Sequence, residues 1–254
     1  MFESTLHLPV TLGMFQDLFH APSGGELARI IVRWTHFVGG IAWIGMLYFF
    51  NLVNVNFMKA LDAPTKKTVV PALMPPALWY FRWGAVVTVV AGLMYYAMYI
   101  LNGDARNARD NVWLILLVWL LISLAFWAVY YVLLPKLTKD GKILAAVTAL
   151  LVIVMSVVIV WWLSSRLGDY GSNKTYSIGI GGALGIFMFL NVWGIIWRAQ
   201  KRIIAGTVSG QAAPPELARQ AFLASRTNAW LSLPMLWFMG TSHGDYVMFG
   251  RNAV

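Results

Sequence analysis

The stretch NVWLILLVWLLISLAFWAVYYVLL, residues 111–134, contains no charged side chain. A helix that crosses a bilayer needs about 20 mostly apolar residues, so this stretch is long enough to span a membrane. The rest of the 254-residue chain agrees with this reading, because 59% of its residues are hydrophobic and only 11% are charged. Soluble domains carry about 25% charged residues. The sequence therefore predicts an integral membrane protein.

Five further apolar runs lie on either side of this stretch, at residues 30–57, 77–101, 143–163, 175–198 and 228–249. Pro234, Gly240 and His243 interrupt the last run, and such breaks are tolerated where other helices or a cavity cover the freed backbone. Before it, PPELARQAFLASR (214–226) predicts a short amphipathic surface helix that begins at proline. We expect an all-α fold, a polytopic membrane helical bundle of about six transmembrane helices, forming one domain over residues 1–254.

Composition also limits the class of function. A net charge of +9 would suggest nucleic acid in a soluble protein, but here the basic residues lie in short loops between apolar runs, so we expect no nucleic-acid partner. The chain has no cysteine, which excludes disulfides, thiolate metal sites and covalent c-type haem. No Walker loop, dinucleotide fingerprint or Ser-His-Asp grouping is present. A transporter is disfavoured because no carboxylate pair lies at membrane depth.

The distribution of lysine and arginine predicts the orientation in the membrane. One side carries seven of the 19 basic residues, and the other side carries twelve: Lys59, Lys66, Lys67, Arg82, Lys136, Lys139, Lys142, Arg198, Lys201, Arg202, Arg219 and Arg226. Positively charged loops stay in the cytoplasm. We therefore expect a multi-pass protein of a bacterial inner membrane, with both termini and segment 1–29 in the periplasm and segment 199–227 as a cytoplasmic loop.

Two of the four histidines, His36 and His243, fall inside predicted spans, whereas His7 and His20 precede the first span. Each of the two lies six residues from the outer end of its run, so we expect them at similar depth in the outer leaflet. Histidine is a common ligand of haem iron, and an ionisable side chain inside a span is costly unless it has a function. The pair is a candidate for the axial ligands of a b-type haem, with Ser242 available to hold one imidazole.

The residues around His36 fit the same hypothesis. Gly39 and Gly40 follow on the same helix face and would leave room for a flat macrocycle, and Trp43 could supply an aromatic wall. Arg33, one turn toward the outer surface, could pair with a haem propionate or another anion. The alternative is that the glycines only allow close helix packing and that His36 bonds to a neighbouring helix.

Two segments, RWTHFVGGIAWIGMLYFFNL (33–52) and RTNAWLSLPMLWFMGTSHG (226–244), resemble the hallmark segments of the membrane domain of bacterial cytochrome c-type urate oxidase, or urate hydroxylase. The family's first segment has a histidine, a glycine pair and a tryptophan. Its second has an asparagine near the start, a Leu-Pro pair and a Ser-Asn-His ending. The matching residues here are His36, Gly39, Gly40, Trp43, Asn228, Leu233, Pro234, Ser242 and His243. The asparagine of the ending is absent, since Thr241 precedes Ser242.

This resemblance implies a membrane redox subunit that passes electrons between a periplasmic donor or substrate and a cytochrome or quinone, with urate as a candidate substrate. In that family a cytochrome c domain follows the membrane domain. This chain ends at Val254 without cysteine, so we expect a separate cytochrome c or other redox protein as partner, beside the lipid bilayer. The alternative function is a cofactor-free membrane anchor or assembly subunit of a larger complex.

Overall fold

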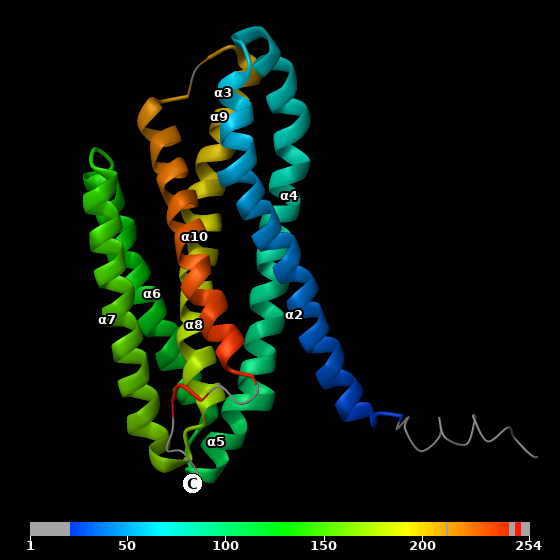
Figure 1. The fold of residues 1–254 in the computed structure, drawn as a ribbon, viewed down its shortest axis with the longest axis vertical. Helices are drawn as coiled ribbons and strands as arrows, with labels where there is room; N and C mark the ends of the chain where they lie inside the picture. The colour runs from blue at the N-terminus through cyan, green and yellow to red at the C-terminus, as the bar shows by residue number, and fades with distance from the viewer. Residues whose placement is uncertain (1–20, 212, 244–246, 250–254) are drawn as a thin grey trace, which may run out of the picture.

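The computed structural model describes residues 21–211, 213–243 and 247–249, and this part of the chain is helical without strands (Figure 1). His7, His20 and most of segment 1–29 lie outside the described residues. The elements are α2 (Gly24–Tyr48), η1 (Phe49–Asn54), α3 (Val55–Ala60), α4 (Ala63–Tyr95), η2 (Tyr96–Leu101), α5 (Asn102–Asn107), α6 (Val112–Leu137), α7 (Gly141–Leu167), η3 (Gly168–Tyr170), α8 (Asn173–Asn191), η4 (Val192–Ile196), α9 (Trp197–Ser209) and α10 (Pro215–Thr241). The segments η1, η2 and η4 are π-helical turns that join α-helices into longer rods.

Side-chain caps explain where the long helices begin. Ser23 forms a capping box with Glu26, and Asp62, Asn111, Asp140 and Ser172 each accept a hydrogen bond from a backbone N–H in the first turn of α4, α6, α7 and α8. Such caps satisfy donors that a helix start leaves unpaired. The first five apolar runs therefore each lie in a helix whose first turn is fixed by a capping residue.

Five rods are long and apolar enough to cross a membrane: 24–60, 63–107, 112–137, 141–170 and 173–209. Each covers one of the first five predicted runs, apart from Asn111 at the start of the third, and each is longer than its run. The rod that begins at Ala63 runs through Pro71, Pro75 and Pro76, whereas the sequence analysis expected the span to begin after these prolines. Helix α10 does not meet the same criterion, because its first half is polar.

The predicted helix at 214–226 is present and begins at proline, but the prediction that it is short is wrong. Helix α10 runs without interruption from Pro215 to Thr241 and includes that segment, and Pro234 does not end it. Segment 199–227, expected as a loop containing one amphipathic helix, is formed by the end of α9 and the first half of α10. The predicted sixth run to Phe249 is also too long, since the helix ends at Thr241, where Ser242 donates from Oγ to the carbonyl of Met239 at 2.7 Å.

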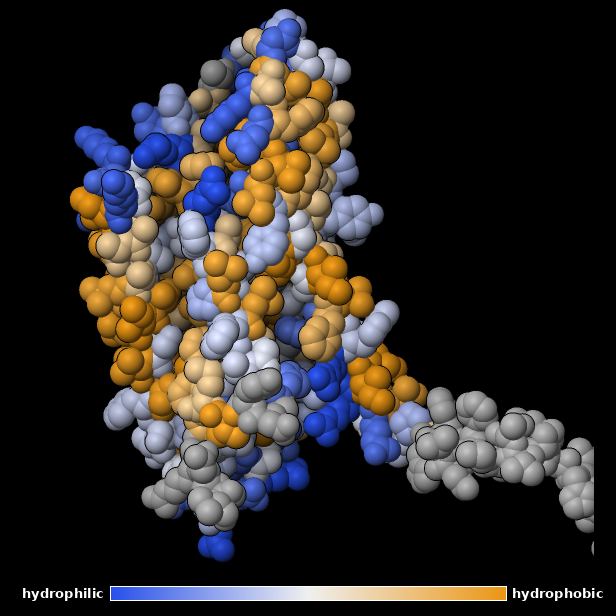
Figure 2. Space-filling model, in the orientation of Figure 1, coloured by the Kyte–Doolittle hydropathy of each residue, from blue (hydrophilic) through white to orange (hydrophobic). Residues whose placement is uncertain are grey.

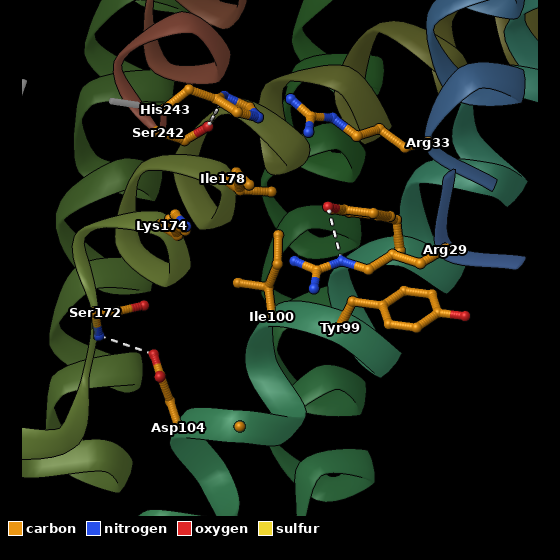
Figure 3. A pocket seen from close by; sticks show the side chains of 12 residues that line it. Arg29, Arg33, Tyr99, Ile100, Asp104, Ser172, Lys174, Ile178, Ser242 and His243 are labelled. Atoms are coloured by element: carbon orange, nitrogen blue, oxygen red, sulfur yellow. Dashed lines mark hydrogen bonds between the residues drawn. The ribbon is translucent and has the colours of Figure 1, made fainter. Parts of the chain in front are cut away.

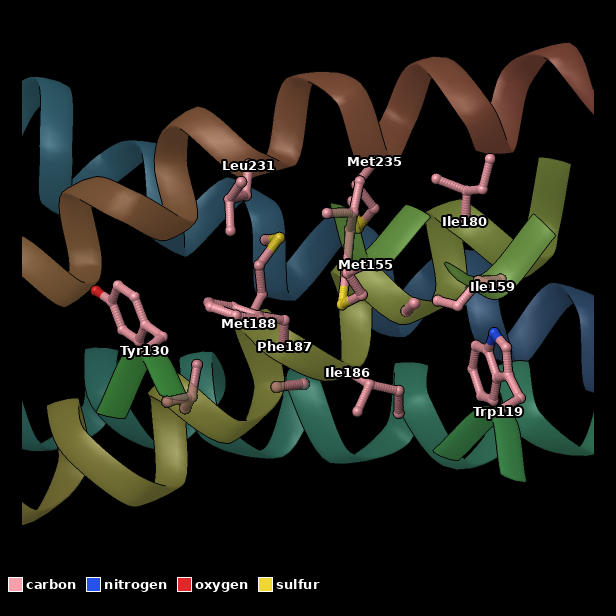
Figure 4. Packing of buried hydrophobic residues seen from close by; sticks show 14 of the residues in the cluster. Trp119, Tyr130, Met155, Ile159, Ile180, Ile186, Phe187, Met188, Leu231 and Met235 are labelled. Atoms are coloured by element: carbon pink, nitrogen blue, oxygen red, sulfur yellow. The ribbon is translucent and has the colours of Figure 1, made fainter. Parts of the chain in front are cut away.

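Helix α8 lies at the centre of the bundle, with α6 and α7 on one flank and α2 and α4 on the other (Figure 1). Its glycines allow close neighbours. A Cβ at Gly182 would lie 3.1 Å from Trp119, and a Cβ at Gly181 would lie 3.2 Å from the carbonyl oxygen of Met235. Large apolar side chains fill the remaining space between α6, α7, α8 and α10 (Figure 4). Figure 2 shows hydrophilic residues at both ends of the molecule and hydrophobic residues over much of the length between them.

Hydrogen bonds between helices add to this packing. Asn191 of α8 donates to Asn228 Oδ1 of α10 at 2.8 Å and accepts from Trp127 Nε1 of α6 at 2.9 Å. On the other side of α10, Asn51 of η1 donates to Ser225 Oγ at 2.9 Å. Polar side chains among membrane helices are stabilised by such partners. These bonds hold α10 between α2 and α8 despite its lower hydrophobicity.

Candidate functional site

A cavity of about 250 Å³ opens at the end of the bundle where α2 begins, α8 begins and α10 ends, which we call the pocket end. Side chains from four rods meet there (Figure 3). The described lining residues are Arg29, Arg33, Tyr95, Tyr99, Ile100, Gly103, Asp104, Ser172, Lys174, Ile178, Ser242 and His243. The cavity therefore gathers residues from both ends of the chain around one space.

Two arginines of α2 form one wall of this cavity. Arg29 and Arg33 are four residues apart, so they lie on the same face of the helix. The guanidinium carbon of Arg29 lies 5.9 Å and 5.8 Å from the ring centroids of Tyr95 and Tyr99, and its Nε lies 3.4 Å from Tyr95 Oη. Arg33 extends across the cavity toward His243 (Figure 3). In the described part of the chain neither arginine has a carboxylate partner.

The opposite wall contains the cation of Lys174 and the carboxylate of Asp104, which already accepts two hydrogen bonds. Asp104 Oδ2 accepts hydrogen bonds from the backbone N–H of Ser172 at 2.8 Å and from Thr175 Oγ1 at 2.6 Å. It therefore ties α5 to the start of α8. Lys174 lies in the first turn of α8, where the helix dipole also favours an anion. Three cations outnumber the one carboxylate among the described lining residues, so the electrostatic potential of the cavity favours anions.

His243 lies just beyond α10 and is exposed, which corrects the prediction that it is buried six residues inside a span. Its Nδ1 lies 2.8 Å from Ser242 Oγ and 3.2 Å from the carbonyl oxygen of Met239. A carbonyl only accepts, so Nδ1 carries the proton and Nε2 keeps its lone pair. Both Ser242 Oγ and the Met239 carbonyl therefore hold this imidazole.

His36 lies well inside α2 and faces α4. Its Nδ1 donates to the carbonyl oxygen of Thr88 at 2.8 Å, which again leaves Nε2 with the lone pair. The ring packs on Gly92, where a Cβ would come within 2.8 Å of it. His36 is absent from the cavity lining, while Arg33 and His243 are both part of it. The structure therefore brings Arg33, not His36, to the same cavity as His243.

The other residues predicted beside His36 lie between α2 and α4. A Cβ at Gly39 would lie 2.9 Å from Thr88 Oγ1, and Gly40 lies beside the same threonine with more space. Trp43 is 1% exposed, and its Nε1 has no hydrogen-bond partner in the described structure. Close packing of α2 on α4 accounts for Gly39, as the alternative reading held. A haem site at these residues stays a prediction.

Four of the lining residues were not predicted from the sequence: Arg29, Tyr95, Tyr99 and Lys174. Arg29 could have been predicted, because it precedes Arg33 by one helical turn. Nothing in the sequence marks Tyr95 and Tyr99, since they belong to a long apolar run. Tyr99 lies in the π-helical turn η2, which changes the direction of side chains along the rod, and such turns are frequent at functional sites.

Among known protein families, the one whose model matches is described as urate oxidase N-terminal, and it matches residues 61–253. The match includes the segment 226–244, with Ser242 and His243, and does not extend to 33–52. No curated protein matches the chain, and no solved structure matches it.

Proposed function

The chain belongs to the urate oxidase N-terminal family, and from this membership we propose that it is a membrane redox subunit whose cavity at the pocket end binds a planar organic anion of the urate class. The observation that carries the proposal is the excess of cations in the cavity, where Arg29, Arg33 and Lys174 have no carboxylate partner among the described residues. The three side chains are exposed, and positive charges gathered around one cavity raise the local concentration of anions there.

The cavity offers both recognition elements that such an anion needs. Arginine presents a planar fork of donors that matches delocalised oxygen and nitrogen anions, and Lys174 adds a point charge. The tilted rings of Tyr95 and Tyr99, with centroids 5.5 Å apart, provide an aromatic surface against which a flat ring can pack. We propose that Arg33 and Lys174 bind the charged edge of the ligand while Arg29 positions the tyrosines.

The haem b that the sequence suggested can be tested against the donor atoms present. His36 and His243 each have Nδ1 engaged by a carbonyl oxygen, and this leaves Nε2 as the ligating nitrogen. Each imidazole could therefore offer Nε2 to haem iron, although His36 does not line the cavity that His243 lines. When bound, the haem would supply one-electron redox chemistry. Thr88 and Met239 would fix the tautomer and the orientation of the two imidazoles.

We propose that the pocket end faces the periplasm, as the lysine and arginine distribution predicts, and that electrons leave for a separate cytochrome c or a quinone. Proteoliposomes that contain the protein should then reduce added cytochrome c when urate is supplied. Arg33→Gln should slow this reduction, whereas Arg106→Gln, an exposed arginine outside the cavity lining, should not. A chain that never transfers electrons would favour the alternative, a cofactor-free membrane anchor.

A visible spectrum of the purified protein tests the haem separately. We expect a Soret band that sharpens on reduction with dithionite. His36→Ala and His243→Ala should each lose the low-spin signal, and His7→Ala and His20→Ala should keep it. If either of the first two variants keeps a full six-coordinate spectrum, the assignment of that histidine as a ligand is wrong.

A further inference from the structure

A second group of aromatic and basic side chains lies far from the cavity, on α4, η4 and α9. We call it the aromatic–cation cluster, and it consists of Trp79, Arg82, Trp83, Trp193, Trp197 and Lys201. Neither the family match nor the proposed redox function accounts for it.

Two tryptophan rings and one backbone carbonyl oxygen hold the guanidinium of Arg82 in place. Its Cζ lies 3.4 Å from the ring centroid of Trp197 and 5.6 Å from that of Trp193. Its Nε donates to the carbonyl oxygen of Leu78 at 3.1 Å. No carboxylate of the described chain pairs with Arg82. The two terminal nitrogens of a fixed, partly buried arginine therefore remain available for an anion.

Two further residues of the cluster carry donors. The Nε1 of Trp193 is buried and has no hydrogen-bond partner in the described structure. Such an unpaired donor costs free energy, which a bound acceptor would recover. Lys201 places its Nζ 5.5 Å from the other tryptophan of the stack, Trp197. An acceptor with delocalised negative charge would satisfy both residues and Arg82.

The position of the cluster along the bundle axis indicates which kind of molecule supplies that acceptor. From Arg82 the rod of α4, η2 and α5 runs about 20 residues to Asn102 at the pocket end, which is about 30 Å and equals the thickness of a bilayer's hydrocarbon core. Taking the pocket end as one boundary of that core puts Arg82 at the opposite boundary. Trp79 and Trp83 are 49% and 44% exposed there, as expected for tryptophans at headgroup level.

We propose that the aromatic–cation cluster binds the phosphate of an anionic phospholipid, in the leaflet at the end of the bundle away from the cavity. Arg82 and Trp193 Nε1 donate to the phosphate oxygens, and Lys201 contributes a second positive charge. The exposed rings of Trp79 and Trp83 pack against the glycerol and upper acyl chains. One bound lipid would thereby join α4 to α9.

Native mass spectrometry of the purified protein, released from nanodiscs of phosphatidylcholine containing phosphatidylglycerol, tests the proposal. The wild type should retain one phosphatidylglycerol in preference to phosphatidylcholine. Arg82→Gln should reduce that retention at least about tenfold, because a charge-assisted hydrogen bond is lost. Trp193→Phe keeps the ring and removes only the N–H, so it should reduce retention less and leave folding intact.

Arg198→Gln is the matched control, because Arg198 is exposed and adjoins Trp197 but makes no contact with the cluster's rings. It should retain lipid like the wild type. Equal loss in Arg198→Gln and Arg82→Gln would overturn the proposal in favour of a diffuse positive surface. Displacement of the lipid by millimolar inorganic phosphate would overturn it in favour of a free-phosphate site. Full retention in both Arg82→Gln and Trp193→Phe would exclude the cluster altogether.

Discussion

At the scale of single residues, Arg33 has the environment that best distinguishes a binding residue from a membrane anchor. Among the described residues its guanidinium contacts one aromatic ring, Phe37, whose centroid lies 5.7 Å from Cζ, and its end points across the cavity toward His243 (Figure 3). An arginine that only anchored the helix would extend to the headgroups. The direction of Arg33 therefore supports a role in binding.

Replacing Arg33 by lysine tests whether its planar fork matters. Arg33→Lys keeps the charge and loses the bidentate geometry, so we expect the dissociation constant for urate to rise, by less than for Arg33→Gln. Equilibrium dialysis with the purified protein measures it. Arg106→Lys serves as control and should bind like the wild type. An unchanged dissociation constant in Arg33→Lys would leave Arg33 as an interfacial anchor.

The sequence could single out Arg33, Ser242 and His243, which all line the cavity, because polar and ionisable side chains stand out within an apolar run. It could not show that His36 turns toward α4. That orientation depends on Gly92, a residue of another helix that leaves space for the imidazole ring. The prediction that His36 and His243 lie at similar depth was based on residue counts alone. It did not include the tilt of α2 or the early end of α10.

At the scale of elements, the crossing of α2 and α4 determines where Arg29, Arg33 and His36 lie. Gly39 and Gly84 face each other there, and a Cβ at Gly84 would come within 3.0 Å of the backbone nitrogen of Trp43. Small residues allow such close backbone approach in membrane helices. The glycines therefore contribute to the site indirectly, through the position of α2.

Gly39→Ala should separate the two helices, because its Cβ would meet Thr88 Oγ1 at 2.9 Å and the Thr88 backbone nitrogen at 3.0 Å. We expect a loss of about 1–3 kcal/mol, the usual cost of overpacking, seen as a lower Tm in detergent. Gly40→Ala is the matched control, since its Cβ would lie 3.8 Å from the nearest atom. Equal Tm values for both variants would contradict the crossing described here.

A second tie between elements is the ion pair of Asp110 and Arg166, with 2.7 Å between Oδ1 and Nη2. Burial alone would raise the pKa of the Asp110 carboxyl, but hydrogen bonds from Arg166 and the Asn111 N–H lower it overall. A lowered pKa contributes stability above the ordinary value of 3.8 that is lost as the pH falls through the folded-state value.

Asp110→Asn should therefore lower the free energy of unfolding at neutral pH by less than about 1 kcal/mol, as is usual for a partly exposed pair. It should also remove part of the loss of stability in acid. Denaturation curves at neutral and acid pH measure both effects. A variant that loses stability in acid as steeply as the wild type would show that other carboxylates are responsible.

The sequence predicted the five membrane-compatible rods because their apolar runs are long. It could not place α10 correctly, since nothing in the run from Ser225 to Asn228 marks whether two helices meet or one continues. The contacts of Asn228 with Asn191 and of Ser225 with Asn51 decide this, and they join residues distant in the sequence.

At the scale of the whole molecule, the start of α2 and the end of α10 lie at the same end of the bundle (Figure 1). We predict that this end faces the periplasm. Alkaline phosphatase fused after Val254 should be active, and green fluorescent protein fused there should stay dark. Fusions after Lys139, between α6 and α7, should give the opposite pattern. The reverse result at both sites would place the cavity in the cytoplasm.

Calorimetric titration of the purified protein with urate at neutral pH tests the central claim, an anion-binding cavity at the pocket end, most directly. The wild type should bind urate with one site and bind hypoxanthine, a neutral purine, more weakly. The double variant Arg29→Gln with Arg33→Gln should weaken urate binding at least about tenfold. Urate binding that is absent in the wild type, or equally tight in the double variant, would contradict the account.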